Sequence, residues 1–164
     1  MHILVINPGA TFTKLAVFQE KQEEWRSTLL HSQEDLAPFH HVNEQTGYRL
    51  ELILQEVEKA GYHMADFAAV VGRGGLLRHI PSGTYKVNQR AVDDMNDPPM
   101  GEHAANLGVL ICDELTRRYG MPSYFVDPVS VDELEPVARI SGHAAFERQI
   151  LTLKIPVNQM ASYD

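Results

Sequence analysis

The first eighteen residues constrain the fold most, because they join two apolar segments through a very short polar connection. Residues 3–6 are apolar without alternation, which is typical of a strand covered on both faces. Residues 14–18 indicate a second strand, and Asn7-Pro8-Gly9 marks the turn between them. A third strand is predicted over residues 25–30. Three strands spaced so closely predict an antiparallel meander that leads into a larger sheet.

Helices and strands are predicted to follow one another along the rest of the chain. Apolar residues at helical spacing predict a helix that opens at residues 43–45 and ends at Gly61. Asn88 is the expected N-cap of a short helix through Met95, and a long helix over residues 102–119 is expected to end at Gly120. Further strands are predicted at residues 67–71, 84–87 and 123–126. The pattern indicates an α/β domain with a mixed sheet.

Composition excludes several classes of function. The formal net charge of −8 disfavours non-specific binding to nucleic acid or to an anionic membrane surface. No apolar run approaches the ~18 residues of a membrane helix, and the chain opens directly with a strand rather than a secretory leader. Cys112 is the only cysteine, which suits a buried, inert thiol in a reducing compartment. We therefore expect a cytoplasmic protein of one ordinary domain.

The connection between the first two strands allows two interpretations. It is not a P-loop, because Thr13 precedes Lys14 and a strand follows instead of a helix. Asn7, Thr11 and Thr13 nevertheless supply amide and hydroxyl groups, Gly9 permits close backbone approach, and Lys14 adds a positive charge. Such a tip could hold phosphate oxygens. The same residues also make an ordinary hairpin turn, and the residues alone leave both interpretations open.

Three further residues are candidates for a site. Arg73 lies among Gly72, Gly74 and Gly75, so its guanidinium could grip a carboxylate or phosphoryl group, or simply be solvated. Asp127 follows a predicted strand and precedes a proline, where a carboxylate can hold Mg²⁺ or cap a turn. His103 could polarise a substrate oxygen or serve only the structure.

Five segments, taken in order, resemble the first half of the butyrate kinases. They are INPGATFTKLAVF, LLHSQEDL, AVVGRGGLLRHIPSGTYKVN, GEHAANLG and YFVDPVSVDELEPVARISG, and the resemblance covers about residues 2–149. Butyrate kinase is similar to acetate kinase and belongs with the sugar kinases, heat-shock ATPases and actin. The resemblance implies a ribonuclease-H-like, actin-like ATPase domain with flanking helices, in which the first turn is a phosphate loop.

The resemblance also implies an activity and roles for the candidate residues. The activity is reversible phosphoryl transfer between ATP and butyrate, giving butanoyl phosphate and ADP, with Mg²⁺ as cofactor. The turn residues Asn7, Gly9, Thr11, Thr13 and Lys14 would bind the transferring phosphate. The other three would be catalytic: Arg73 would bind the carboxylate or the transition state, Asp127 would lie near the metal and the nucleotide, and His103 would line the acyl site.

After Gln149 the chain departs from the family pattern. We therefore expect a butyrate-kinase-like N-terminal domain at residues 1–149 and a divergent tail at residues 150–164. The family's nucleotide-binding second domain is not found in this sequence, so the expected form is shortened and has little or no kinase activity alone. The alternative is a non-catalytic binding module that forms homo-oligomers through the face that would otherwise pack on the second domain.

Overall fold

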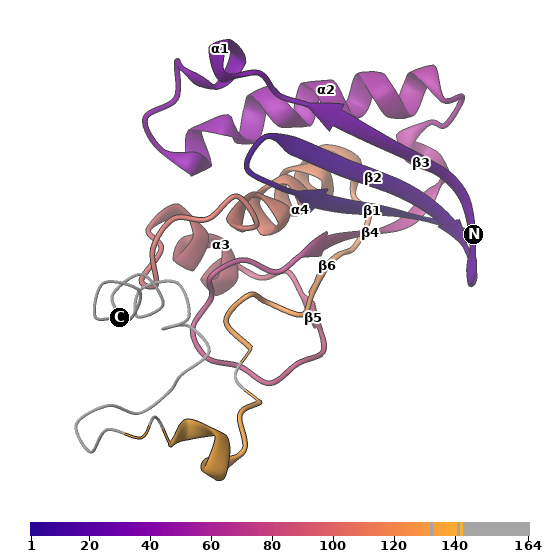
Figure 1. The fold of residues 1–164 in the computed structure, drawn as a ribbon. Coiled ribbons are helices and arrows are strands. Elements are labelled where there is room, and N and C mark those ends of the chain that lie inside the picture. The colour runs from indigo at the N-terminus through magenta and orange to yellow at the C-terminus, as the bar shows by residue number, and fades with distance from the viewer. Residues whose placement is uncertain (132, 141, 143–164) are drawn as a thin grey trace.

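A six-stranded mixed sheet forms the centre of the computed structural model, which describes residues 1–131, 133–140 and 142. The strand order is β3-β2-β1-β4-β6-β5 (Figure 1). The bounds are β1 His2–Pro8, β2 Phe12–Gln19, β3 Gln22–Leu30, β4 Phe67–Arg73, β5 Thr84–Lys86 and β6 Ser123–Val126. β1, β2 and β3 pair antiparallel, whereas β4 is parallel to both β1 and β6. β5 returns antiparallel to β6. The predicted meander and mixed sheet are confirmed.

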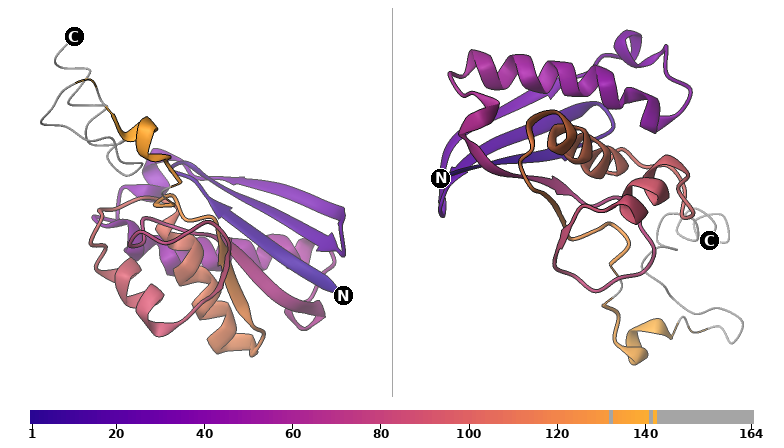
Figure 2. Two further views of the ribbon diagram at one scale, coloured as in Figure 1. Left: turned by 90° about the horizontal axis from the view of Figure 1, so that it is seen from below. Right: turned by 180° about the vertical axis from the view of Figure 1, so that it is seen from behind.

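The helices gather on one face of this sheet, as Figures 1 and 2 show. Their bounds are α1 Gln33–Leu36, α2 Thr46–Lys59, α3 Gln89–Asn96 and α4 Asn106–Tyr119, with short 3₁₀ helices at Val42–Gln45, Met64–Asp66 and Pro136–Arg139. α4 packs on β1, β4 and β6, while α2 packs on α4 and β3, and α3 packs on α4. No helix in the described ranges combines the length and apolar content that crossing a membrane requires.

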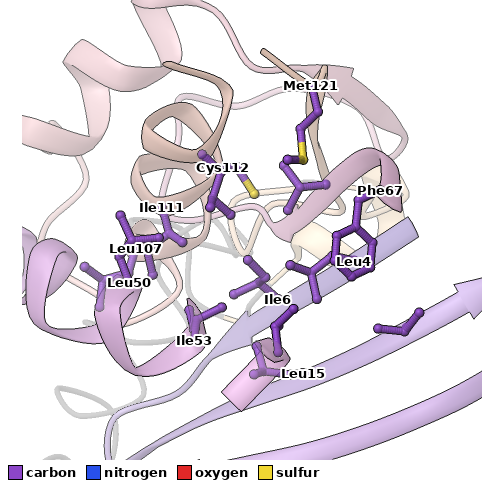
Figure 3. Close-up of a cluster of buried hydrophobic side chains, with 14 residues drawn as sticks. Leu4, Ile6, Leu15, Leu50, Ile53, Phe67, Leu107, Ile111, Cys112 and Met121 are labelled. Atoms are coloured by element: carbon purple, nitrogen blue, oxygen red, sulfur yellow. The ribbon is translucent and has the colours of Figure 1, made fainter. Parts of the chain in front are cut away.

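The main core fills the space between the sheet and α2 and α4. Side chains alternate along a strand, so Leu4 and Ile6 of β1 point the same way as Leu15 and Val17 of β2. All four are essentially fully buried, and each such side chain stabilises the fold by about 1.5–3 kcal/mol. Figure 3 shows their neighbours, which include Leu50, Ile53, Leu107 and Ile111.

The other face of the sheet carries the intervening side chains. Ile3, Val5 and Asn7 of β1 are only half-buried, and they pair across the sheet with Phe18, Ala16 and Lys14 of β2. In β4, Val71 and Arg73 occupy the equivalent positions beside β1. We call these eight residues the open face. The expectation that residues 3–6 are covered on both faces was wrong for Ile3 and Val5.

Two helix ends agree with the sequence patterns, and one does not. Asn88 caps α3 by accepting a hydrogen bond from the Ala91 N–H, and Gly120 ends α4 in the left-handed conformation. α4 begins at Asn106 instead of Glu102. The reason is a tight turn before it, in which the His103 carbonyl accepts from the Asn106 N–H and His103 Nδ1 accepts from the Ala105 N–H.

Two other expectations have different outcomes. Cys112 is fully buried, and burial raises the pKa of its thiol, which agrees with an inert residue. The predicted boundary at Gln149 and the tail at residues 150–164 lie outside the described residues. Helix α1 was not predicted, although Ser32 and Asp35 form a capping box at its start.

Candidate functional site

Three parallel strands end side by side at one edge of the sheet. Ile6 of β1 pairs with Gly72 of β4, and Arg73 of β4 pairs with Val126 of β6. Asn7 follows Ile6 and therefore lies beside Arg73 on one side. On the other side Val126 lies beside Arg73, and Asp127 follows one residue further on. Since neighbouring strands are about 4.8 Å apart, the three strand ends span roughly 10 Å. Ligands of open α/β sheets commonly bind outside the carboxyl ends of the strands, which makes this edge the candidate site.

Polar and cationic side chains meet on the open face at this edge. Asn7 and Lys14 are direct cross-strand partners, and Lys14 is exposed. Arg73 is also exposed, and none of the ion pairs found in the described part of the chain involves it. Two cations beside an amide could bind an anion such as a phosphoryl group or a carboxylate. The strand register places Asn7, Lys14 and Arg73 on three neighbouring strands of the open face, and their role as an anion site stays a prediction.

The turn between β1 and β2 is closed by an aromatic ring. A Cβ atom at Gly9 would lie 2.3–2.6 Å from atoms of the Phe12 ring, so a side chain at this position would require the ring to move. The expectation that Gly9 permits close backbone approach to a phosphate stays a prediction. Lys14 Nζ lies 5.3 Å from the centre of the same ring, within the range of a cation–π contact. Thr11 is exposed at the tip, as a ligand contact requires.

Thr13 does not lie where the sequence placed it. Its side chain is fully buried, with Oγ1 2.8 Å from His31 Nε2 and 3.1 Å from Arg49 Nη1. The arginine can only donate, so the Thr13 hydroxyl accepts from Arg49 and finds an acceptor for its own proton in His31 Nε2. Strand alternation explains the difference, because Thr13 shares the buried face with Leu15. Thr13 therefore supports the turn from inside instead of facing a phosphate.

Arg49 was missed by the sequence reasoning, although it is fully buried in α2. Its guanidinium donates to the carbonyls of Gly9 (2.8 Å), Phe12 (3.0 Å) and Ala10 (3.1 Å). It also donates to Gln45 Oε1 from Nε and Nη2. Burial lowers the Arg49 pKa to about 10, so the group stays charged at neutral pH. A charged residue four positions before the buried Ile53 was the signal available in the sequence.

His31 shares this buried network. Burial, with the nearby Arg49 charge, lowers its pKa to about 4, so the imidazole is neutral at pH 7. Because Nε2 accepts from Thr13, the proton lies on Nδ1, which is 3.4 Å from the Tyr48 hydroxyl. Among the described residues, the hydrogen bonds of Arg49 reach no carboxylate, and all of its acceptors are neutral oxygens.

Asp127 lies just beyond β6 and is exposed. Its backbone has φ 39°, a left-handed conformation that is uncommon for a residue with a side chain. Asp127 Oδ1 accepts a hydrogen bond of 3.2 Å from the Gly83 N–H, so the carboxylate stabilises the neighbouring loop. In the described ranges, no three His, Cys, Asp or Glu residues form a metal cluster. Asp127 could hold Mg²⁺ only as a single carboxylate, together with water and substrate phosphates, which is a common arrangement for this ion.

His103 lies in the turn that precedes α4. That helix meets β4 very closely: a Cβ atom at Gly108 would lie 2.2 Å from the Arg73 carbonyl oxygen. The turn with His103 is therefore at the same end of the sheet as Arg73. Because Nδ1 accepts from the Ala105 N–H, the proton of a neutral His103 is on Nε2.

Comparisons with known proteins identify close relatives. No family model matches the chain. A probable butyrate kinase of Enterococcus faecalis is 46% identical over 147 residues, 90% of this chain and 40% of the relative. Butyrate kinase 1 of Clostridium acetobutylicum is 42% identical over 147 residues, 90% of this chain and 41% of the relative. The chain thus spans about two-fifths of the length of the curated relatives it matches.

A solved structure shows the same fold. Acetate kinase of Porphyromonas gingivalis matches 79% of this chain and 37% of its own, with a TM-score of 0.52 and 14% identity. The likeness confirms the predicted α/β, ribonuclease-H-like architecture of a mixed sheet with flanking helices. Over nine-tenths of its length, the chain is therefore a homologue of the butyrate kinases and corresponds to their N-terminal part.

Proposed function

We propose that this chain supplies the N-terminal part of a butyrate kinase active site. The activity is reversible phosphoryl transfer between ATP and butyrate, giving butanoyl phosphate and ADP. The observation that carries the proposal is the meeting of Asn7, Lys14 and Arg73 on one face of one sheet edge, in a chain 42–46% identical to butyrate kinases. Those relatives are more than twice as long, so we expect little or no turnover from these 164 residues alone.

The chemistry explains why these residue types are needed. A butyrate oxygen forms a bond to the γ-phosphorus of ATP while the bond from that phosphorus to the oxygen of ADP breaks, and ADP keeps the electron pair. The protein must hold two anions in line and balance their charge. Lys14 and Arg73 would supply fixed positive charge, with Arg73 on the carboxylate. The Asn7 amide and the Thr11 hydroxyl would donate hydrogen bonds to the transferring group.

Asp127 and His103 complete the proposed set. Mg²⁺, when bound with the nucleotide, would neutralise charge that develops on the phosphate oxygens. Asp127 would hold this ion through its carboxylate, and the Gly83 contact would keep that carboxylate in place. His103, on the turn before α4, would line the acyl site. A short-chain carboxylate is then the substrate class.

A non-catalytic binding module is the alternative, and one observation favours it. Beyond its polar residues, the open face consists of half-buried apolar side chains, among them Ile3, Val5, Phe18 and Val71. Such a surface could join two copies of the chain. A dimer in light scattering that Val5→Lys converts to a monomer, with no phosphate binding, would favour the module.

The kinase proposal is tested by anion binding to the chain. Inorganic phosphate is titrated by calorimetry into the unmodified chain and into Arg73→Ala and Lys14→Ala. A charge-assisted hydrogen bond contributes about 1.5–3 kcal/mol, so each variant should bind roughly tenfold or more weakly. Arg117→Ala is the control, because that exposed arginine pairs with Asp113 near the far end of α4. Equal affinities in all four proteins would refute the proposed site.

A further inference from the structure

We infer that Arg49 is a positioning residue of the anion site, and that it acts by turning two backbone N–H groups of the β1–β2 turn outward. The inference rests on the proposed function and assigns a role to a residue that none of the ligand contacts requires. Arg49 touches no solvent, and six hydrogen bonds hold its guanidinium under the turn.

The first step follows from peptide geometry. A trans peptide is planar, so its C=O and N–H point in opposite directions, and the described chain contains no cis peptide. Arg49 draws the Gly9 and Ala10 carbonyls toward itself, at 2.8 Å and 3.1 Å. The N–H groups of the same two peptides belong to Ala10 and Thr11. These two N–H groups therefore point away from Arg49.

The N–H groups of Ala10 and Thr11 are available to a ligand. Ala10 and Thr11 are exposed, and neither N–H has an acceptor among the described residues. Arg49 belongs to α2, which packs on the helix-covered face of the sheet. The two N–H groups thus point to the side of the open face, where Asn7 and Lys14 lie. Adjacent outward N–H groups form a small anion-binding concavity.

The third step is electrostatic. Buried charges in proteins are normally paired with an opposite charge. All acceptors of Arg49 are neutral, namely three carbonyls, one hydroxyl and one amide oxygen. The carbonyl dipoles stabilise the cation, and their N–H ends carry positive potential outward. An anion at the turn would complete this arrangement, so a phosphoryl group is the ligand class.

A guanidinium suits this role better than an ammonium. It is planar and carries five donors in fixed directions, and Arg49 uses Nε, Nη1 and Nη2 at once. Lysine could reach one or two carbonyls but could not hold both peptide planes and Gln45 together. The Arg49→Lys variant thus keeps the positive charge but no longer fixes the orientation of the two peptide groups.

The test is a titration of the ¹⁵N-labelled chain with inorganic phosphate, followed by amide NMR. We expect the Ala10 and Thr11 amide resonances to move most within the turn, and Arg49→Lys to reduce both these shifts and the affinity, by roughly tenfold. Val57→Ala is the control, because it removes buried volume from the same helix. It should lower stability without changing phosphate affinity.

The outcomes separate this inference from the proposed function. Phosphate binding that moves the Asn7 and Lys14 amide resonances but leaves those of Ala10 and Thr11 unchanged would overturn the roles of Arg49 and Thr11. The kinase proposal would then still stand on Asn7, Lys14 and Arg73. No binding to the unmodified chain would overturn both. If Arg49→Lys does not fold, Gln45→Leu serves instead, since it removes one of the acceptors that orient the guanidinium and should give a smaller loss of affinity.

Discussion

Two neighbouring parts of the candidate site are held in place by opposite means. The β1–β2 turn is held by polar bonds, because the buried Arg49 donates to three of its carbonyls and to Thr13. The junction of β4 with α4 is held by the lack of side chains. There, Gly72 and Gly108 bring two backbones together, and a Cβ at Gly72 would lie 2.5 Å from the Gly108 carbonyl oxygen.

The contrast shows that one part of a site can be held in place by hydrogen bonds and a neighbouring part by close packing of backbone at glycines. A turn held by hydrogen bonds should respond to the loss of a donor or acceptor and to pH. A junction held by close backbone packing should respond to added volume and hardly to pH. Substitutions in the turn and in the junction test whether the two parts respond in these different ways.

The largest effect is expected from Gly108→Ala. The added Cβ would lie 2.2 Å from the Arg73 carbonyl oxygen, which is backbone and cannot rotate away. We expect the free energy of unfolding to fall by about 3 kcal/mol, because the cost of overpacking exceeds the modest gain in helix propensity. Urea denaturation followed by circular dichroism measures this change.

Gly47→Ala is the matched control for this substitution. Gly47 lies in the first turn of α2, and a Cβ there would meet nothing within 4 Å. Alanine should therefore stabilise the chain by about 0.5–1 kcal/mol. If both substitutions had the same effect, close packing would not be what holds the junction.

The second prediction concerns pH and the turn. The His31 pKa is lowered to about 4 in the folded chain, from an ordinary value of 6.5. Between pH 6.5 and 4, His31 is therefore protonated in the unfolded chain but neutral in the folded chain. This difference is absent above pH 6.5, and it lowers the free energy of unfolding as the pH falls toward 4. At 1.36 kcal/mol per pKa unit, and with partial screening by solvent, the loss of stability is on the order of 2 kcal/mol.

Urea denaturation at several pH values between 7 and 4 measures this loss. His31→Gln keeps an acceptor near Thr13 but does not titrate, so its stability should fall less over the same range. His79→Gln, at an exposed histidine, should keep the full pH dependence. Equal slopes for all three proteins would show that His31 is not buried as described.

Much of the fold could be predicted because the sequence signals for strands and helices are local. Residues 3–6 and 14–18 are apolar enough to indicate strands, and Asn88 and Gly120 mark helix ends by their own chemistry. The adjacency of Asn7 and Lys14 also followed from a short turn. The start of α4 did not, because His103 makes a turn whose hydrogen bonds depend on its ring orientation.

The interior of the site was harder to predict, since it depends on contacts between distant segments. Arg49 lies 36–40 residues from the turn that it supports, and no local sequence pattern indicates which distant segment it contacts. A cation within the apolar face of α2 was a visible anomaly, but its partners were not. The Phe12 ring that covers Gly9 could not be predicted either, because its orientation depends on the folded turn.

The last prediction separates the two threonines that the sequence treated alike. Thr13→Val keeps the shape but removes the hydroxyl between Arg49 and His31, which should cost about 1–2 kcal/mol of stability. Thr11→Val changes an exposed side chain, so stability should change by less than about 0.5 kcal/mol while phosphate binding weakens. Denaturation and phosphate titration of both variants measure the two quantities. The opposite pattern, with Thr13→Val weakening phosphate binding at unchanged stability, would mean that the turn presents Thr13 to the ligand and that Arg49 does not hold it inside.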